Sequence, residues 1–173
     1  MGKLRKMLGH KNSPYIVPLM RLLETQSKET IARWCLGYAE AHILPIYEKE
    51  YPADVRPRSA LAAARRWFAG SAKLPEVKRV ILEECHAAAR QAQSTPAAQA
   101  AARACGHMPA HSLGLAFYGA AALAYSKAGF AQSPVVYEEI AAEECAKMEA
   151  ALRAIMVENE PCPAKLNWHC TAF

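Results

Sequence analysis

The chain has 173 residues, and 36 of them are alanine, against four phenylalanines and three tryptophans. This length suits one domain, and the alanine content is typical of closely spaced helices with small residues at their contacts. No uninterrupted apolar run approaches the roughly 18 residues of a membrane span, and no signal peptide is visible. The sequence therefore predicts a cytoplasmic protein without membrane contact.

The net charge of +5 is modest and unevenly spread along the chain. Lys3, Arg5, Lys6 and Lys11 precede any acidic residue, and we expect residues 1–13 to form a basic, flexible, solvated arm. So short a basic stretch is weak evidence for nucleic-acid binding, and we expect no nucleic-acid partner. Four of the six cysteines lie singly inside helical patterns, which favours reduced thiols in the cytoplasm.

Proline and small polar residues mark the starts of the predicted helices. Prolines 14, 75, 96 and 134 suit first helical positions, and Ser27 is the expected N-cap of a further helix. Gly70 and Gly129 stand where helix-ending glycines belong. No segment shows the sustained period-two alternation of a strand. The predicted helices span residues 14–25, 28–50, 57–70, 75–93, 96–105, 108–128 and 134–158. The sequence thus predicts an all-α fold, a single compact bundle of about six or seven helices over residues 14–160.

Three features of the later part of the chain bear on this fold. Gly106 and Pro109 leave open whether residues 96–128 form two helices or one kinked helix. In the last predicted helix, Glu143/Lys147 and Glu149/Arg153 are expected to pair four residues apart. Beyond it, residues 161–173 have no helical period, and we expect this tail to pack on the body through Leu166 and Trp168.

A polar corner between two alanine-rich helices is the first candidate site. Pro57 suits the start of a helix, and Asp54 lies where a carboxylate meets the free N–H groups of that helix. Arg56 and Arg58 bring two planar guanidinium groups beside this carboxylate. Such a corner favours a structural clasp. The other interpretation is a recognition patch anchored by Tyr47 and Tyr51 together with Asp54, Arg56 and Arg58, because Tyr and Arg are enriched at binding hot spots.

Histidines and a glutamate form the second candidate site. Glu83 and His86 make a Glu-x-x-His pattern, and His107 and His111 stand four residues apart, as paired metal ligands do. A di-metal bundle needs a second Glu-x-x-His, which is missing, and Pro109 interrupts the histidine pair. We therefore expect a structural role for these residues and no cofactor, and we keep a small metalloprotein or enzyme as the alternative.

The corner begins a longer pattern, which reads Tyr51-Pro52-x-Asp54-x-Arg56-Pro57-Arg58-x-Ala60-Leu61-x-Ala63-Ala64-Arg65-x-Trp67. Further segments follow in order: His86-Ala-Ala-Ala-Arg90, Pro96-Ala-Ala-x-Ala-Ala-Ala-Arg103-Ala-x-Gly106-His107 and His111-x-Leu-Gly114-x-Ala-x-Tyr118. Over about residues 30–126 the chain resembles the Imm-five-like family of bacterial immunity proteins. The first motif is fairly specific, whereas the alanine-rich segments are less so. The resemblance implies a helical protein of a toxin system, without an assigned reaction.

These observations lead to a hypothesis of function. We expect a non-catalytic protein that binds and neutralises a cognate toxin, through the corner at residues 47–58 or through the acidic face of residues 134–158 against a basic partner. The Glu/His metalloprotein is the rival from another class, and a homo-oligomeric structural protein is the third interpretation.

Overall fold

The computed structural model describes residues 4–107 and 113–168, and its fold is all-α, as predicted. Seven continuous helices follow one another, and three of them contain a π-helical turn, labelled η. In chain order, the elements are α1 (Val17–Leu23), α2 (Lys28–Tyr38), η1 (Ala39–Ile43), α3 (Leu44–Glu50), α4 (Arg56–Phe68), α5 (Leu74–Arg79), η2 (Val80–Cys85), α6 (His86–Gln91), α7 (Pro96–His107), η3 (Leu115–Gly119), α8 (Ala120–Ala128) and α9 (Pro134–Arg153). None of them, within the described residues, is long and apolar enough to cross a membrane.

The predicted helix ends are confirmed at several places. The hydroxyl of Ser27 accepts a hydrogen bond from the N–H of Thr30, and that of Ser133 accepts one from Val136. Gly70 and Gly129 have φ angles of 73° and 70°, which residues with a side chain rarely adopt. Residues 96–128 contain two helices, because α7 ends at His107 and η3 begins only at Leu115.

A π-helical turn allows the second helix to continue through Pro45. Pro45 has no N–H to donate, and in a regular helix its ring would collide with the carbonyl four residues back. At this point the N–H of Leu44 bonds to the carbonyl of Ala39, five residues earlier. The wider turn makes room for the proline ring, so α2, η1 and α3 form one helix over 28–50, with the predicted bounds.

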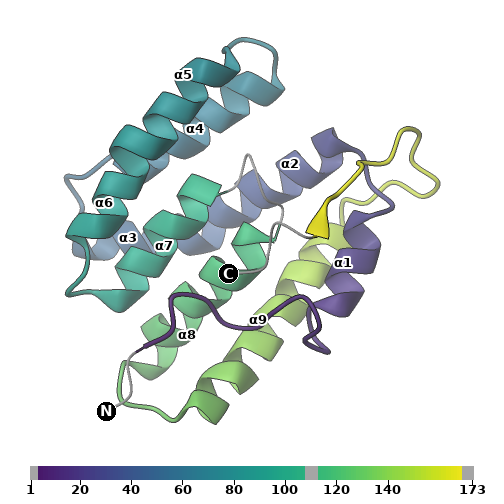
Figure 1. Cartoon of the computed structure of the whole chain (residues 1–173). Helices are drawn as coiled ribbons and strands as arrows, with labels where there is room; N and C mark the ends of the chain where they lie inside the picture. The colour runs from purple at the N-terminus through teal and green to yellow at the C-terminus, as the bar shows by residue number, and fades with distance from the viewer. Residues whose placement is uncertain (1–3, 108–112, 169–173) are drawn as a thin grey trace.

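Helix α7 lies in the middle of the bundle, and it contacts α3, α4, α6 and α8 (Figure 1). Ala98, Ala101, Ala102 and Ala104 on this helix are all 0% exposed. Side chains of this size allow neighbouring helices to approach closely, as the composition indicated. Gly106 belongs to the same small-residue contact surface of α7. A Cβ at this position would lie only 2.9 Å from Cδ2 of His86, so the contact has no room for a side chain.

Helix α9 ends at Arg153, five residues before the predicted end at 158. The reason is a tertiary contact that a helical period does not encode. The side-chain amide of Gln26 donates to the carbonyl of Val157, and its oxygen accepts from the N–H of the same residue. The following segment continues along α1, where the indole N–H of Trp168 donates to Glu24 over 2.6 Å and Leu166 packs on the core.

The predicted ion pairs of α9 are half correct. Arg153 bonds to Glu149, as expected. Lys147, however, bonds to Glu144 over 2.7 Å and not to Glu143. Glu144 is 3% exposed and also accepts a hydrogen bond from Lys127 of α8, so one buried carboxylate forms ion pairs with two lysines. This arrangement leaves Glu143 exposed.

Residues 4–13, which we call the N-terminal segment, lie against the body, in contrast to the predicted solvated arm. Figure 1 shows this segment crossing α8 and α9. Leu8 is 2% exposed and its N–H bonds to the carbonyl of Phe117, while Tyr125 donates its hydroxyl hydrogen to the carbonyl of Arg5 over 2.6 Å. The predicted solvated arm rests on the charges of this segment. Its apolar residues Leu4, Met7 and Leu8 instead pack against the core.

Candidate functional site

The corner between α3 and α4 is built around the carboxylate of Asp54. One oxygen accepts from the backbone N–H of Arg56 over 3.1 Å and from its Nε over 2.8 Å. The other accepts from Nη2 of Arg56 over 2.6 Å and from the hydroxyl of Tyr47 over 2.5 Å. The hydrogen bonds from Arg56 outweigh the effect of burial and lower the pKa of Asp54 to about 2. The carboxylate is therefore charged and fully bonded at neutral pH.

The partners of the corner come from the end of α6 and from the turn that leads to α7. Nη2 of Arg56 also donates to the side-chain oxygen of Gln91 over 2.6 Å, and the hydroxyl of Tyr51 lies 3.1 Å from that of Thr95. Tyr47 is 1% exposed, so it supports the corner from inside and is not accessible to a partner. These contacts are those of a clasp that ties three helices together.

The outer side of the corner remains available at the surface. Arg58 pairs with Glu48 through two hydrogen bonds of 2.7 and 2.8 Å, and its side chain is 61% exposed. Val55 is 59% exposed beside it. A recognition role of Tyr51, Asp54, Arg56 and Arg58 would therefore use the exposed outer side of the corner. We call this side, with Val55 and Arg58, the rim.

The structure brings together two of the four residues of the predicted metal cluster. The rings of His86 and His107 are stacked, with centroids 5.2 Å apart, and the ring of Tyr118 lies 4.6 Å from that of His107. Nδ1 of His107 lies 2.7 Å from the carbonyl of Arg103. Nε2 of His86 is buried without a hydrogen-bond partner, and burial, followed by the charges of Arg90 and Arg103, lowers the pKa of this imidazole.

Glu83 does not join these histidines. Its side chain is 67% exposed and lies 3.9 Å from Arg79. The Glu-x-x-His prediction assumed a regular α-helix, but η2 ends with the N–H of His86 bonded to the carbonyl of Ile81, five residues back. In this wider turn three residues cover a smaller part of a revolution, so positions 83 and 86 diverge. His111 lies outside the described residues, and within them no three potential ligands converge on a metal position.

Neither thiol near the histidines has the character of a nucleophile. Cys85 donates to the carbonyl of Ala102, and burial raises its pKa to about 12. Burial also raises the pKa of Cys105 well above the usual value. Reactive cysteines need a lowered pKa and access to solvent, and these two have neither.

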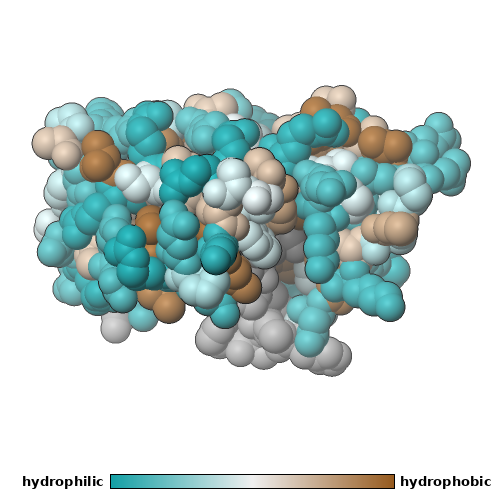
Figure 2. Space-filling view, turned by 90° about the horizontal axis from the view of Figure 1, so that it is seen from above, coloured by the Kyte–Doolittle hydropathy of each residue, from teal (hydrophilic) through white to brown (hydrophobic). Residues whose placement is uncertain are grey.

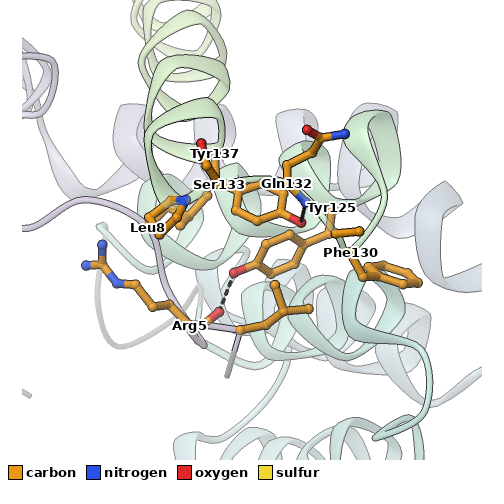
Figure 3. Close-up of a pocket in the computed structure, with 10 residues that line it drawn as sticks. Arg5, Leu8, Tyr125, Phe130, Gln132, Ser133 and Tyr137 are labelled. Carbon is orange, nitrogen blue, oxygen red and sulfur yellow. Dashed lines mark hydrogen bonds between the residues drawn. The ribbon is translucent and has the colours of Figure 1, made fainter. Parts of the chain in front are cut away.

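Two surface hollows flank the N-terminal segment, and no motif in the sequence indicates either of them. The larger, of about 370 Å³, lies between this segment and the turn from α8 to α9, and Figure 3 shows aromatic side chains along it. Tyr125 and Tyr137 meet there edge to face with centroids 5.0 Å apart, and Phe130 is 41% exposed. The smaller hollow, of about 230 Å³, lies on the other side of Arg5 and reaches α7.

Exposed large apolar side chains are spread along the described part of the chain. The large apolar side chains that are exposed in the described residues lie apart from one another along the chain, at Val55, Leu74, Leu82, Phe130, Val135 and Val157. Figure 2 shows one face of the molecule, on which hydrophobic residues form small separate patches among hydrophilic ones. The described residues visible on that face therefore form no extended apolar patch.

A comparison with known families completes the description of the site. The model of a family described as "Imm-5 like putative immunity protein" matches residues 21–151. The chain belongs to this family. The matched residues of the Imm-5 like domain include the corner, α7 and the histidines, but not the N-terminal segment. No curated protein and no solved structure matches the chain.

Proposed function

We propose that this protein is an immunity protein that binds a cognate toxin in the cytoplasm and neutralises it without catalysis of its own. The family membership over residues 21–151 carries this proposal. The clasp around Asp54 supports it, because its hydrogen bonds fix the side chains of the corner relative to one another, as a preformed contact surface requires. Cys85, Cys105, Cys145 and Cys162 are free thiols, which suits a reducing compartment.

The acidic face of α9 is a poor candidate for the contact with a toxin. Of its glutamates, Glu138 bonds to Arg5 and Tyr15, Glu144 to two lysines, and Glu149 to Arg153. Glu160, beyond the helix, bonds to Ser27 and Thr30. A basic toxin would have to displace these partners, and it would find only Glu139 and Glu143 of α9 exposed and without an ion pair in the described residues. We place the contact at the rim of the corner instead.

The experiment is protection of bacteria against the toxin whose gene lies directly beside the gene for this chain. The toxin is induced in cells that do or do not express this protein, and growth is followed. Restored growth is the expected result, and an unrelated toxin should kill both cultures equally. Continued killing despite soluble expression of this protein, or a gene neighbourhood that holds only metabolic enzymes, would overturn the proposal.

The rim of the corner has a test of its own. Arg58→Ala removes an exposed guanidinium from α4, and Arg66→Ala removes an exposed, paired guanidinium near the other end of the same helix. If the toxin contacts the rim, only Arg58→Ala weakens the measured affinity for the toxin. Equal affinities of both variants and the wild type would place the contact elsewhere.

A further inference from the structure

Arg103 is an unusual arginine within this molecule. Among the described residues, only Arg56 and Arg103 are half-buried arginines, since the others are exposed. Arg56 has the carboxylate of Asp54, whereas no acidic side chain of the described residues pairs with Arg103. Burial lowers the pKa of this guanidinium and the ring of Tyr118 lies nearby, which shows a charge partly removed from water without compensation.

Arg103 lines the smaller hollow, whose other charged residues are also basic. Lys6 and Arg5 extend from the N-terminal segment, and no acidic residue lines the hollow. Arg5 is neutralised by Glu138 over 2.5 Å, but Lys6 is exposed and forms no ion pair within the described chain. Two uncompensated cations thus border one concave surface, together with Gln93 and Gln99.

We propose that this cationic hollow binds carboxylate side chains of an acidic segment of a protein partner, with Arg103 as the central contact. A guanidinium binds a carboxylate through two parallel hydrogen bonds, and a preformed concave site lessens the cost of ordering it. The proposal deepens the proposed function, on which the identity of the partner as a toxin rests. If the partner is the toxin, the toxin presents acidic side chains to this hollow.

The surroundings of the hollow favour a polypeptide over a small free anion. The apolar hollow adjoins it and shares Leu4, Arg5 and Tyr125, so an acidic and an apolar side chain of one segment fit side by side. On the opposite side, the wall of the hollow continues into the connection that holds the corner. Gln91 at the end of α6 and Thr95 in the following turn bond to the corner, and Gln93 and Pro96 of the same connection line the hollow. The surface therefore extends well beyond one phosphate group.

The test uses a fluorescent hexaglutamate peptide as the probe, with hexaglutamine as the neutral control and the full-length chain at low salt. Anisotropy should show saturable binding of hexaglutamate only, weakening as salt is added. Arg103→Gln should weaken it about tenfold, the effect of one lost charged hydrogen bond. Arg21→Gln is the matched control, because Arg21 is exposed, has no ion pair within the described residues and lies outside the hollow. It should bind as the wild type does.

Each remaining outcome decides the proposal. Equal binding by Arg103→Gln and the wild type, or binding of hexaglutamine as tight as that of hexaglutamate, would overturn it. Binding of inorganic phosphate without binding of hexaglutamate would assign the hollow to a free anion and overturn the protein partner. The Arg103→Gln chain should melt no lower than the wild type, so lost binding cannot arise from unfolding. If hexaglutamate binds but the neighbouring toxin does not, the hollow is a carboxylate-binding site and the proposed immunity function is wrong.

Discussion

Asp54 accepts four hydrogen bonds in the folded chain, three from Arg56 and one from the buried Tyr47. The resemblance to the family rests most firmly on the motif that contains this residue, and its contacts all lie within the molecule. A carboxylate with four donors stabilises the fold, whether or not the rim also contacts a partner. The side chain of Asp54 is 19% exposed, so solvent replaces few of these bonds when they are lost.

Asp54→Ala should lower the free energy of unfolding by about 2 kcal/mol, because the variant leaves Arg56 and the hydroxyl of Tyr47 without their acceptor. Chemical denaturation at neutral pH measures this change. Arg58→Ala is the control, and it should have little effect because its ion pair is exposed. If Asp54→Ala keeps full stability but abolishes toxin binding, the corner is a recognition patch and not a clasp.

The same carboxylate predicts a dependence on pH. Its folded pKa of about 2 lies below the unfolded value of 3.8, so it contributes stability above the unfolded pKa and loses it as pH falls through the folded pKa. The difference in stability between the wild type and Asp54→Ala should therefore be largest near neutral pH and shrink below the unfolded pKa. Denaturation curves of both proteins over this range check it, and a difference that stays constant with pH would contradict it.

At the scale of the elements, the helices were largely predictable, and the turns within them were not. Capping serines, prolines and helix-ending glycines mark the chain locally, and the bounds of the helix over 28–50 follow from Ser27 before it and Pro52 after it. The π-helical turns have no such local mark. They rotated Glu83 away from His86, and the end of α9 depends on Gln26, more than a hundred residues away. Side chains brought together only by packing, such as Arg103 and Lys6, were likewise out of reach of the sequence.

Gly106→Ala should destabilise the protein by about 1–3 kcal/mol, because the new methyl group would lie 2.9 Å from Cδ2 of His86 and 3.3 Å from the sulfur of Cys85. Gly37→Ala is the matched control on an exposed side of α2. A Cβ there meets nothing within 4 Å, so alanine should stabilise the helix by about 0.5–1 kcal/mol. Thermal melts of the two variants should shift in opposite directions. A stabilising Gly106→Ala would show that α7 and α6 are packed more loosely than described.

Leu8→Ala should lower stability by about 2–4 kcal/mol, since Leu8 is 2% exposed in the core beneath the N-terminal segment. Asn12→Ala changes an exposed side chain of the same segment and should be nearly neutral. Denaturant titration of both variants measures the difference. Equal stabilities of the two variants would restore the predicted solvated arm and remove one wall of the cationic hollow.

At the scale of the whole molecule, the distribution of charge is more informative than its net value of +5. Three of the five glutamates of α9 bond within the molecule, to the N-terminal segment, to α8 and to Arg153 of the same helix. The cations that remain around Arg103 lie on a surface built by the N-terminal segment, α7 and the turn before it. This arrangement underlies the proposed acidic partner, in contrast to the basic partner that the acidic residues alone suggested.

Direct binding of the chain to a toxin encoded beside it is tested by isothermal titration of the purified toxin into the purified chain. We expect saturable binding with a defined stoichiometry and a Kd below about 1 μM, the range of stable specific complexes. Absence of binding between the two folded proteins, with the toxin active in its own assay, would contradict it.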